Sequence, residues 1–259
     1  MTLQNVKQMN PYIKRKIIKK QGIASEERED YIASEKKLRV FINGKEFITL
    51  YCTPLMIEEL VNGLLLTEGI LANKISFKEM RIKYGKEIRF DIITTKDPVT
   101  EGLYTSRCLG GITLNKKRVF KKINDDFSIL SESIKTIFNE FHQKSELFRL
   151  TGCFHSAALS DGQRILAFAE DIGRHNAVDK VIGYCILKDI AFTEKLMLVS
   201  CRLSSEIVSK CSRWGIPIIA SRAAPTDLAI EIAEKSGITL AGFVREDRLN
   251  IYSNAQRII

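Results

Sequence analysis

The second half of the chain alternates short apolar runs with longer segments whose apolar residues recur every three or four positions. Short apolar runs are typical of buried strands, and longer periodic segments are typical of helices that bury one face. The predicted strands are 156–159, 164–168, 195–200, 216–220, 238–244 and 249–252, and the predicted helices are 131–141, 176–188, 204–213 and 225–236. Such alternation indicates βαβ crossovers, so we expect an α/β domain with a mostly parallel sheet.

The first half of the chain carries hairpin signals instead. Predicted strands 38–42 and 46–50 flank Asn43-Gly44, and a second pair is predicted at 80–84 and 88–92. Pro54 suits the first turn of a helix whose apolar residues are 57, 60, 61, 64 and 65. We therefore expect three parts, namely an N-terminal arm (1–37), a smaller β-rich α+β domain (38–129) and the larger α/β domain (130–259).

Composition narrows the class of protein. The 259 residues are 45% hydrophobic and 27% charged, as in an ordinary soluble globular chain. No apolar stretch approaches the roughly 18 residues of a membrane span, and the N-terminus lacks the apolar region of a secretory signal. We therefore expect a cytoplasmic protein without membrane association, whose six cysteines are thiols.

The net charge of +9 is concentrated at one end of the chain. Residues 1–20 hold six basic residues and no acidic one, and the rest of the chain is nearly balanced. This distribution does not support a nucleic-acid-binding face, so we expect no nucleic-acid partner. The arm either attracts a phosphate-rich ligand or an acidic partner, or it is a solvated edge strand or tail.

Two segments gather residues that could carry chemistry. Cys108 lies in Ser-Arg-Cys-Leu-Gly-Gly, where a neighbouring cation could favour the reactive thiolate, although an ordinary loop thiol is the alternative. The run 170–180 packs acids, Arg174 and His175 just before a predicted helix. A helix start favours anions, Arg174 suits phosphate, and His175 suits proton transfer. The alternative is a plain helix start, capped by Asn176 or a neighbour, with a surface ion pair.

The loops after the predicted parallel strands are the expected place for a ligand, because such sheets bind ligands beyond the carboxyl ends of their strands. These loops are 200–204, 221–226 and 245–248. Cys153 and His155 precede another strand. We interpret His155 as structural. Cys153 is either a second reactive thiol or, as we favour, a small apolar filler, and Cys201 is either a filler or a reactive thiol at a strand end.

The segment DIGRHNAVDKVIG (171–183) resembles the central signature of the FdhD/NarQ family, the formate dehydrogenase accessory sulfurtransferases. Further segments are similar to the family in the same order, at 40–47, 53–71, 147–159, 198–208 and 215–253. The resemblance implies a cytidine deaminase-like α/β fold for the larger domain and a cytoplasmic homodimer. It also implies a sulfurtransferase that takes sulfur from a cysteine desulfurase as a cysteine persulfide. The sulfur would pass to the molybdenum or tungsten bis-pterin guanine dinucleotide cofactor of formate dehydrogenase, whose site would also accept a guanine nucleotide such as GDP.

Carried over residue by residue, the resemblance makes Cys108 the persulfide carrier, and the family's second loop cysteine falls at Gly111. One thiolate is enough to attack a sulfur donor. Arg174 and His175 match the signature, and the cofactor would lie against Phe243, Val244, Arg245, Glu246, Asp247 and Arg248. Cys153 and Cys201 stand where the family usually has glycine, either as neutral changes or as substitutes for the missing cysteine.

Three other functions compete with sulfur transfer through Cys108. With Gly111 in place of a cysteine, the chain could be a non-catalytic chaperone for the molybdenum or tungsten cofactor. A nucleobase deaminase needs H-x-E and P-C-x-x-C around zinc, and neither motif occurs, so we expect no zinc and no other bound metal. A nucleic-acid binder rests only on the net charge, most of which lies in the arm.

Overall fold

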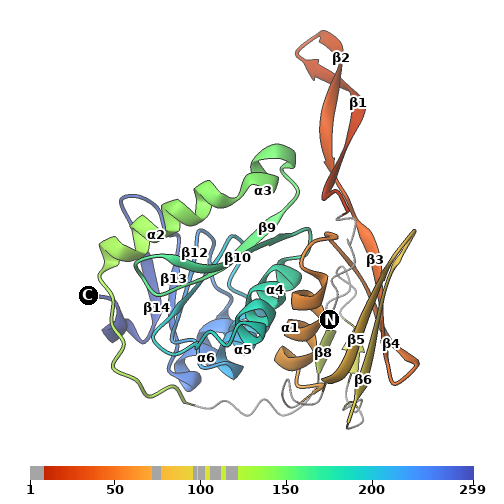
Figure 1. The fold of residues 1–259 in the computed structure, drawn as a ribbon. Coiled ribbons are helices and arrows are strands. Elements are labelled where there is room, and N and C mark those ends of the chain that lie inside the picture. The colour runs from red at the N-terminus through yellow and green to blue at the C-terminus, as the bar shows by residue number, and fades with distance from the viewer. Residues whose placement is uncertain (1–8, 72–76, 96–97, 99–102, 106–111, 115–121) are drawn as a thin grey trace.

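The computed structural model describes residues 9–71, 77–95, 98, 103–105, 112–114 and 122–259 (Figure 1). The larger sheet has six strands in the order β10-β9-β11-β12-β13-β14. Their bounds are His155–Ser160 (β9), Ile165–Asp171 (β10), Leu196–Val199 (β11), Ile218–Ser221 (β12), Thr239–Gly242 (β13) and Asn250–Ser253 (β14). The central strands β11, β12 and β13 are parallel, and β9 and β14 run against them, so four of the six strands point the same way.

Helices cover both faces of the larger sheet, which makes three layers. Helix α2 (Ser131–Lys144) packs on one face through a cluster that includes Phe138, Phe141 and Leu198. On the other face lie α4 (Arg174–Leu187), α5 (Ser205–Arg213) and α6 (Asp227–Ser236). Every residue of β11 is buried, which explains its continuous apolar run. The α/β architecture expected from the sequence is confirmed.

The smaller sheet has four strands in the order β4-β3-β6-β5. Their bounds are Lys36–Ile42 (β3), Lys45–Cys52 (β4), Phe77–Tyr84 (β5) and Ile88–Thr94 (β6), and α1 (Ile57–Thr67) packs on the inner face. Both predicted hairpins are confirmed. Asn43 and Gly44 have positive φ angles of 50° and 80°, as the two-residue turn requires. The helix begins three residues after Pro54, so the prediction that Pro54 occupies the first turn is wrong.

Helices α1 and α4 join the two sheets (Figure 1). A Cβ atom on Gly63 would lie 1.9 Å from the carbonyl oxygen of Asp179, and one on Gly183 would lie 1.9 Å from that of Glu59. The two helices therefore touch backbone to backbone. One hydrophobic cluster runs from the smaller sheet through this crossing into the larger sheet. The division of the chain into domains at residues 37 and 129 stays a prediction.

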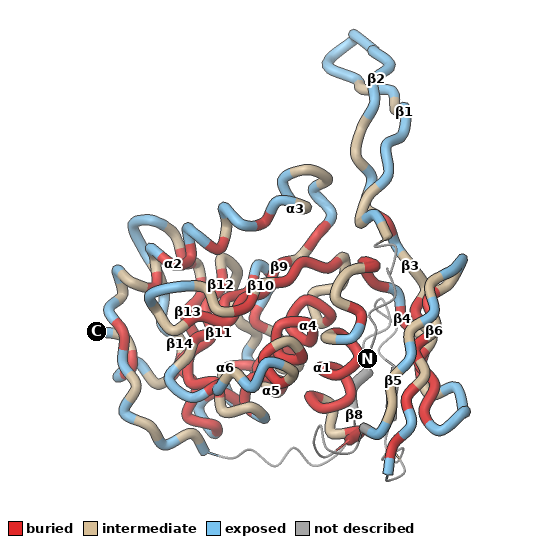
Figure 2. The backbone as a smooth tube through the Cα atoms, viewed as in Figure 1, coloured by how far each residue is buried: buried red, intermediate tan, exposed pale blue. Residues whose placement is uncertain are grey.

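Strands β1 (Tyr12–Gln21) and β2 (Ala24–Ala33) form an antiparallel hairpin that projects from the body, and most of its residues are exposed (Figures 1 and 2). Five of the six basic residues among positions 1–20 lie on β1, and several acidic residues of β2 pair with this strand. Lys16 Nζ lies 2.9 Å from a carboxylate oxygen of Glu27. The basic run is therefore a solvated strand whose charge is partly balanced by its neighbour.

Four shorter elements complete the described chain. Helix α3 (Glu146–Thr151) follows α2, and a 3₁₀ helix (Ala255–Arg257) lies near the C-terminus. Strands β7 (Leu103–Thr105) and β8 (Ile112–Leu114) pair with each other. Among the described residues, no helix is both long and apolar enough to cross a membrane.

Candidate functional site

The polar residues of the signature 171–183 mostly have a structural role. Asp171 and Lys180 are fully buried, with Lys180 Nζ 2.6 Å from Asp171 Oδ2. The same carboxylate accepts a hydrogen bond from the backbone N–H of Thr53 at 3.0 Å, and Asn176 donates one to Asp171 Oδ1 at 2.9 Å. Gly173 occupies the N-cap position of α4. Of the two expected caps, Asn176 or a neighbour, Asn176 is not the cap, because its side chain holds Asp171 instead.

A second buried cluster ties α1, α4 and α5 together. Lys210 Nζ lies 2.6 Å from Glu68 Oε1, 2.8 Å from Asp179 Oδ1 and 2.9 Å from the hydroxyl oxygen of Thr67. Burial raises the pKa of Asp179, and Lys210 works against that rise. Burial opposes the charge of Lys210, but the two carboxylates outweigh it and hold the pKa of Lys210 above its ordinary value.

Arg174 and His175 belong to neither of these two buried clusters. Both lie in the first turn of α4. His175 Nε2 lies 3.0 Å from a carboxylate oxygen of Glu206 at the start of α5. Arg174 acts on His155, whose pKa is lowered by burial and then by this guanidinium. Neither signature residue lines the two cavities described next, so the structure does not bring them together with the residues 243–248.

A cavity of about 360 Å³ lies beyond the carboxyl ends of β12 and β13, and we call it the arginine cavity. Its lining residues are Arg222, Arg245, Glu246, Asp247 and Arg248. Arg245 is fixed by hydrogen bonds from Nη1 to the carbonyl oxygens of Arg222, at 3.0 Å, and Val244, at 2.9 Å. Burial, Arg222 and Arg248 all lower the pKa of Arg245. Three guanidinium groups at one sheet edge make a site suited to a polyanion.

The segment 243–248 turns sharply to present these side chains. Phe243 has a φ of 50°, in the left-handed region, and Val244 is buried and donates its N–H to the carbonyl oxygen of Ser221 at 3.0 Å. Phe243 and Val244 therefore position the turn, whereas the four residues after them line the cavity.

A second cavity of about 270 Å³ lies beside the first, and we call it the aromatic cavity. It is lined by Phe138, Phe141, Phe148 and Phe154, and by the polar or reactive side chains of His142, Cys153, His155, Ser156, Ser200 and Arg222. Strand β9 runs against β11, so its first residues reach the edge where β11 ends. A narrow space of about 30 Å³ has lining residues from both cavities, including Phe138, His142, Arg222 and Arg245. The two cavities thus form one hollow with Arg222 between them.

His142 and Arg222 both line the narrow space between the two cavities, and they contact each other. Arg222 Nη1 lies 3.1 Å from His142 Nε2. A guanidinium can only donate, so Nε2 accepts and the imidazole is neutral in this contact. Burial and the nearby Arg222 and Arg149 lower the pKa of His142, which agrees with a neutral ring.

The described cysteines fall into two groups. Cys52, Cys185, Cys201 and Cys211 are buried, and burial raises the pKa of each thiol, to about 12 for Cys52 and Cys185 and about 11 for Cys201. Cys153 is exposed, so its interpretation as a buried filler is wrong. Gly152 explains the difference, because its φ of 69° ends α3 and turns the chain outward. Cys108 lies outside the described residues, in the segment between β7 and β8.

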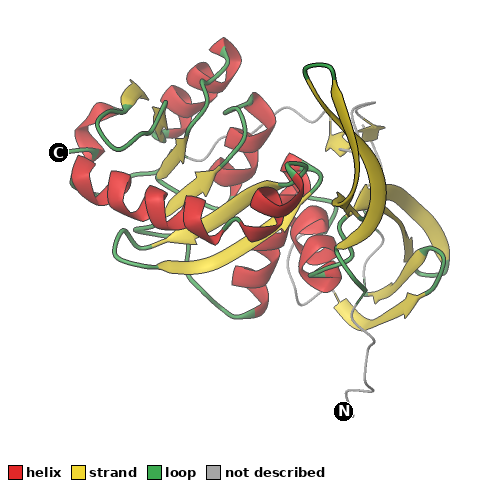
Figure 3. Cartoon of the chain, turned by 90° about the horizontal axis from the view of Figure 1, so that it is seen from above, coloured by secondary structure: helices red, strands yellow, loops and turns green. Residues whose placement is uncertain are grey.

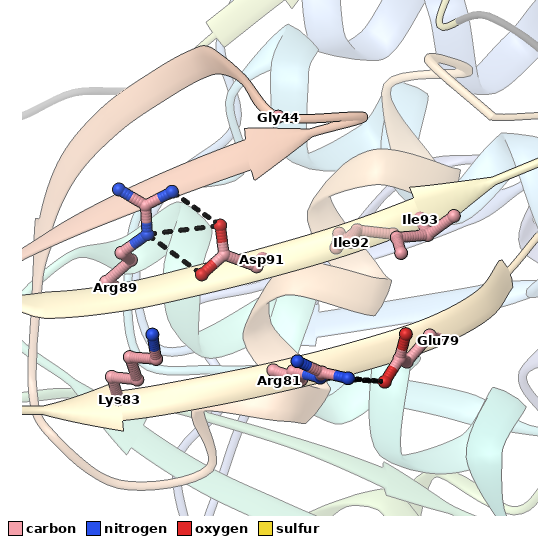
Figure 4. Close-up of a pocket in the computed structure, with 8 residues that line it drawn as sticks. All are labelled: Gly44, Glu79, Arg81, Lys83, Arg89, Asp91, Ile92 and Ile93. Carbon is pink, nitrogen blue, oxygen red and sulfur yellow. Dashed lines mark hydrogen bonds and ion pairs between the residues drawn. The ribbon is translucent and has the colours of Figure 1, made fainter.

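A further cavity of about 470 Å³ lies against β5 and β6 of the smaller sheet (Figure 4). Its basic residues are Arg81, Lys83 and Arg89. Arg89 bonds Asp91 through Nε and Nη2, and Arg81 Nη2 lies 2.6 Å from Glu79. Two of its three cations are held in ion pairs with these acids, whereas among the described residues no ion pair joins Glu246 or Asp247 to an arginine of the arginine cavity. The cavity against β5 and β6 is therefore less suited to a polyanion.

Comparison of the sequence with known proteins identifies the family of this chain. The sequence profile of the FdhD/NarQ family matches residues 33–259. This chain belongs to the FdhD/NarQ family. The sulfur carrier proteins FdhD of Bacillus licheniformis and Bacillus subtilis are each 35% identical to it, over 90% and 89% of this chain and 91% of each relative.

A solved structure of a similar protein has the same fold. The crystal structure of "a putative formate dehydrogenase accessory protein from Desulfotalea psychrophila" superposes with a TM-score of 0.83. It is 28% identical in sequence, and the match covers 96% of this chain and all of that chain. The match therefore includes nearly all of the FdhD/NarQ chain, whose layers are viewed from above in Figure 3.

Sequence reasoning placed part of this site and missed part of it. The loops 221–226 and 245–248 were expected at the ligand edge, and they supply all the residues of the arginine cavity. His142 and the four phenylalanines of the aromatic cavity were missed. The sequence places His142 just after the end of a predicted helix. That position does not reveal its contact with Arg222, which lies 80 residues later in the chain.

Proposed function

We propose that this chain is a sulfur carrier for formate dehydrogenase. Cys108 accepts sulfur from a cysteine desulfurase as a persulfide and passes it to the molybdenum or tungsten bis-pterin guanine dinucleotide bound as substrate in the arginine cavity. The observation that carries the proposal is the likeness, over about nine-tenths of the chain, to proteins named sulfur carrier protein FdhD. Transfer to formate dehydrogenase is further supported by the description of the Desulfotalea psychrophila protein as an accessory protein of that enzyme.

The arginine cavity supports the substrate half of the proposal. A bis-pterin guanine dinucleotide carries several phosphates, and guanidinium groups bind phosphate oxygens in pairs. Arg222, Arg245 and Arg248 offer three such groups around one hollow at the ligand edge of the sheet. The carboxylates of Glu246 and Asp247 line the same hollow and are suited to accept hydrogen bonds from a guanine N–H edge.

The buried thiols support the choice of carrier. The thiolate is the form that attacks a sulfur donor, and burial raises the pKa of four of the five described thiols well above neutral pH. The remaining candidates are Cys153 and Cys108. Cys108 is preferred because it stands at the family's loop cysteine, next to Arg107 in the sequence.

The test is a mass measurement on the purified full chain after incubation with a cysteine desulfurase and cysteine. Trypsin cuts after Arg107 and releases Cys108 in the peptide 108–116, which contains no other cysteine. We expect this peptide to gain one sulfur atom in the wild type and in Ser106→Ala, which keeps the thiol. Absence of the gain in both proteins would contradict the proposal, and the Cys108→Ala chain should fail to restore formate dehydrogenase activity in cells that lack their own carrier.

A non-catalytic cofactor chaperone is the second candidate, because Gly111 stands at the family's second loop cysteine. In that role the chain would bind and hand over the cofactor without carrying sulfur. The same experiment separates the two functions. A Cys108→Ala chain that still supports formate dehydrogenase would favour the chaperone, whereas loss of activity with retained binding of guanosine diphosphate would favour the carrier.

A further inference from the structure

Cys153 differs from every other described cysteine in being open to solvent, and it lies in a cluster of reactive groups. It lines the aromatic cavity with His142, His155 and Arg222. Its position is fixed by the end of α3, where the N–H of Gly152 bonds the carbonyl oxygen of Phe148 at 2.7 Å and the N–H of Cys153 bonds the hydroxyl oxygen of Thr151 at 3.2 Å. The thiol is thus held at the cavity by the backbone.

The groups around this thiol suit sulfur chemistry. His142 already uses its one acceptor nitrogen for Arg222, so the available base is His155, whose pKa is lowered by burial and by Arg174, which favours the neutral ring. A neutral imidazole can take a proton from a thiol, and Arg222 is a cation that attracts an anionic persulfide. The cavity volume of about 270 Å³ leaves room for a sulfur atom beside the thiol, since a water molecule occupies about 30 Å³ in the liquid.

We infer that Cys153 is a second sulfur-carrying thiol, which receives sulfane sulfur from a persulfide and holds it in the aromatic cavity beside the arginine cavity. This inference rests on the function proposed above. The Cys153 thiolate attacks the outer sulfur of a donor R–S–SH. A bond forms between Cys153 Sγ and that sulfur, the S–S bond of the donor breaks, and R–S⁻ leaves and takes up the proton that Cys153 lost. Sulfane sulfur is conserved, so no oxidant or reductant is consumed.

The location explains what a second carrier would do. Arg222 lines both cavities, so sulfur on Cys153 would be held in the cavity next to the proposed cofactor site. The buried Cys201 thiol does not share this position, because it lines neither cavity and burial raises its pKa to about 11. Cys201 therefore provides the matched control. It follows the end of β11 at the same edge of the sheet, but its thiol is buried and a sulfur donor cannot reach it.

The test uses the full chain and glutathione persulfide as the donor. Tryptic cleavage after Arg149 and Arg164 isolates Cys153 in the peptide 150–164, separately from the Cys108 peptide. A variant, S25C, places a reference thiol on the exposed strand β2. Ser25 lines neither the aromatic nor the arginine cavity. We expect peptide 150–164 to gain one sulfur atom in the wild type and in Cys108→Ala, at least about tenfold faster than the reference thiol, because general-base assistance is worth that much or more. Cys201→Ser should leave this rate unchanged.

Two results would overturn the inference. If only Cys108 gains sulfur, or if Cys153 gains it no faster than the reference thiol of S25C, Cys153 is an ordinary surface thiol and the proposed function stands. If neither Cys108 nor Cys153 gains sulfur from glutathione persulfide or from a desulfurase, the proposed function fails together with the inference. The two failures are therefore distinguishable in one set of digests.

Discussion

Replacing Lys210 by methionine should destabilise the fold by about 3–5 kcal/mol, because it leaves the buried carboxylate of Asp179 and the partly buried one of Glu68 without their cation. Lys210 Nζ lies within 3.0 Å of both carboxylates and of the Thr67 hydroxyl, and its side chain is only 5% exposed. Methionine fills a similar volume, so the loss comes from the unpaired charge and not from a cavity. The free energy of unfolding of a folded protein is typically about 5–15 kcal/mol, so the variant should still fold.

Urea denaturation measures this loss, with a midpoint about 1–2 M lower than in the wild type. The exposed pair of Lys235 with Glu231 is the matched control, and Lys235→Met should change the free energy of unfolding by less than about 0.5 kcal/mol. Combining Asp179→Asn with Lys210→Met should be less harmful than the sum of the two single changes, by roughly 1–3 kcal/mol. Additive losses, or a Lys210→Met loss under about 1 kcal/mol, would refute the reasoning.

The loss should also depend on pH in a defined direction. Burial already raises the folded-state pKa of Asp179 above its unfolded value of about 3.9, and removing Lys210 takes away the group that lowers it. A carboxyl group whose pKa is raised by folding binds its proton more tightly in the folded state. Stability of the variant relative to the wild type is therefore lowest at neutral pH and recovers as the pH falls through the raised pKa. A deficit that grows between pH 7 and pH 5 would contradict this assignment.

Three further outcomes follow from the packing and from the cavities. Gly183→Ala should destabilise the chain by about 3 kcal/mol or more in urea, because its Cβ would lie 1.9 Å from the carbonyl oxygen of Glu59, whereas Gly85→Ala meets only an atom at 3.6 Å and should have little effect. Arg248→Ala should weaken guanosine diphosphate binding about 10–100-fold in titration calorimetry, from the loss of a charge-assisted contact, and unchanged affinity would exclude the arginine cavity as the nucleotide site. Iodoacetamide should label Cys153 in the native protein, and only unfolding should expose Cys52, Cys185, Cys201 and Cys211.

Local signals were sufficient for most elements of the fold. The Asn43-Gly44 turn and the apolar run of β11 each depend on a few neighbouring residues, and both were predictable. The start of α1 was less so, because Met56 at its N-cap adopts a left-handed conformation and shifts the helix start past Pro54. The N–H of Thr53 is held by Asp171, 118 residues later, which no local pattern encodes.

The site was predictable only where sheet topology places whole loops. The rule that ligands bind at the carboxyl ends of parallel strands identified the loops that hold Arg222 and Arg245. The signature residues Arg174 and His175 were expected among the ligand contacts, and their direct contact with the cofactor stays a prediction. The exposure of Cys153 depends on the left-handed Gly152, a conformational detail that residue type alone does not determine.

The backbone contact between α1 and α4 limits how the molecule can be divided. Gly63 and Gly183 leave no layer of side chains between the two helices, and the hydrophobic cluster continues across them. A fragment that begins at residue 130 would expose to water the face of α4 that α1 covers, and it would strip Lys210 of Glu68. We therefore expect such a fragment to be insoluble or to aggregate, and co-expression of the two pieces as separate chains to restore a soluble complex.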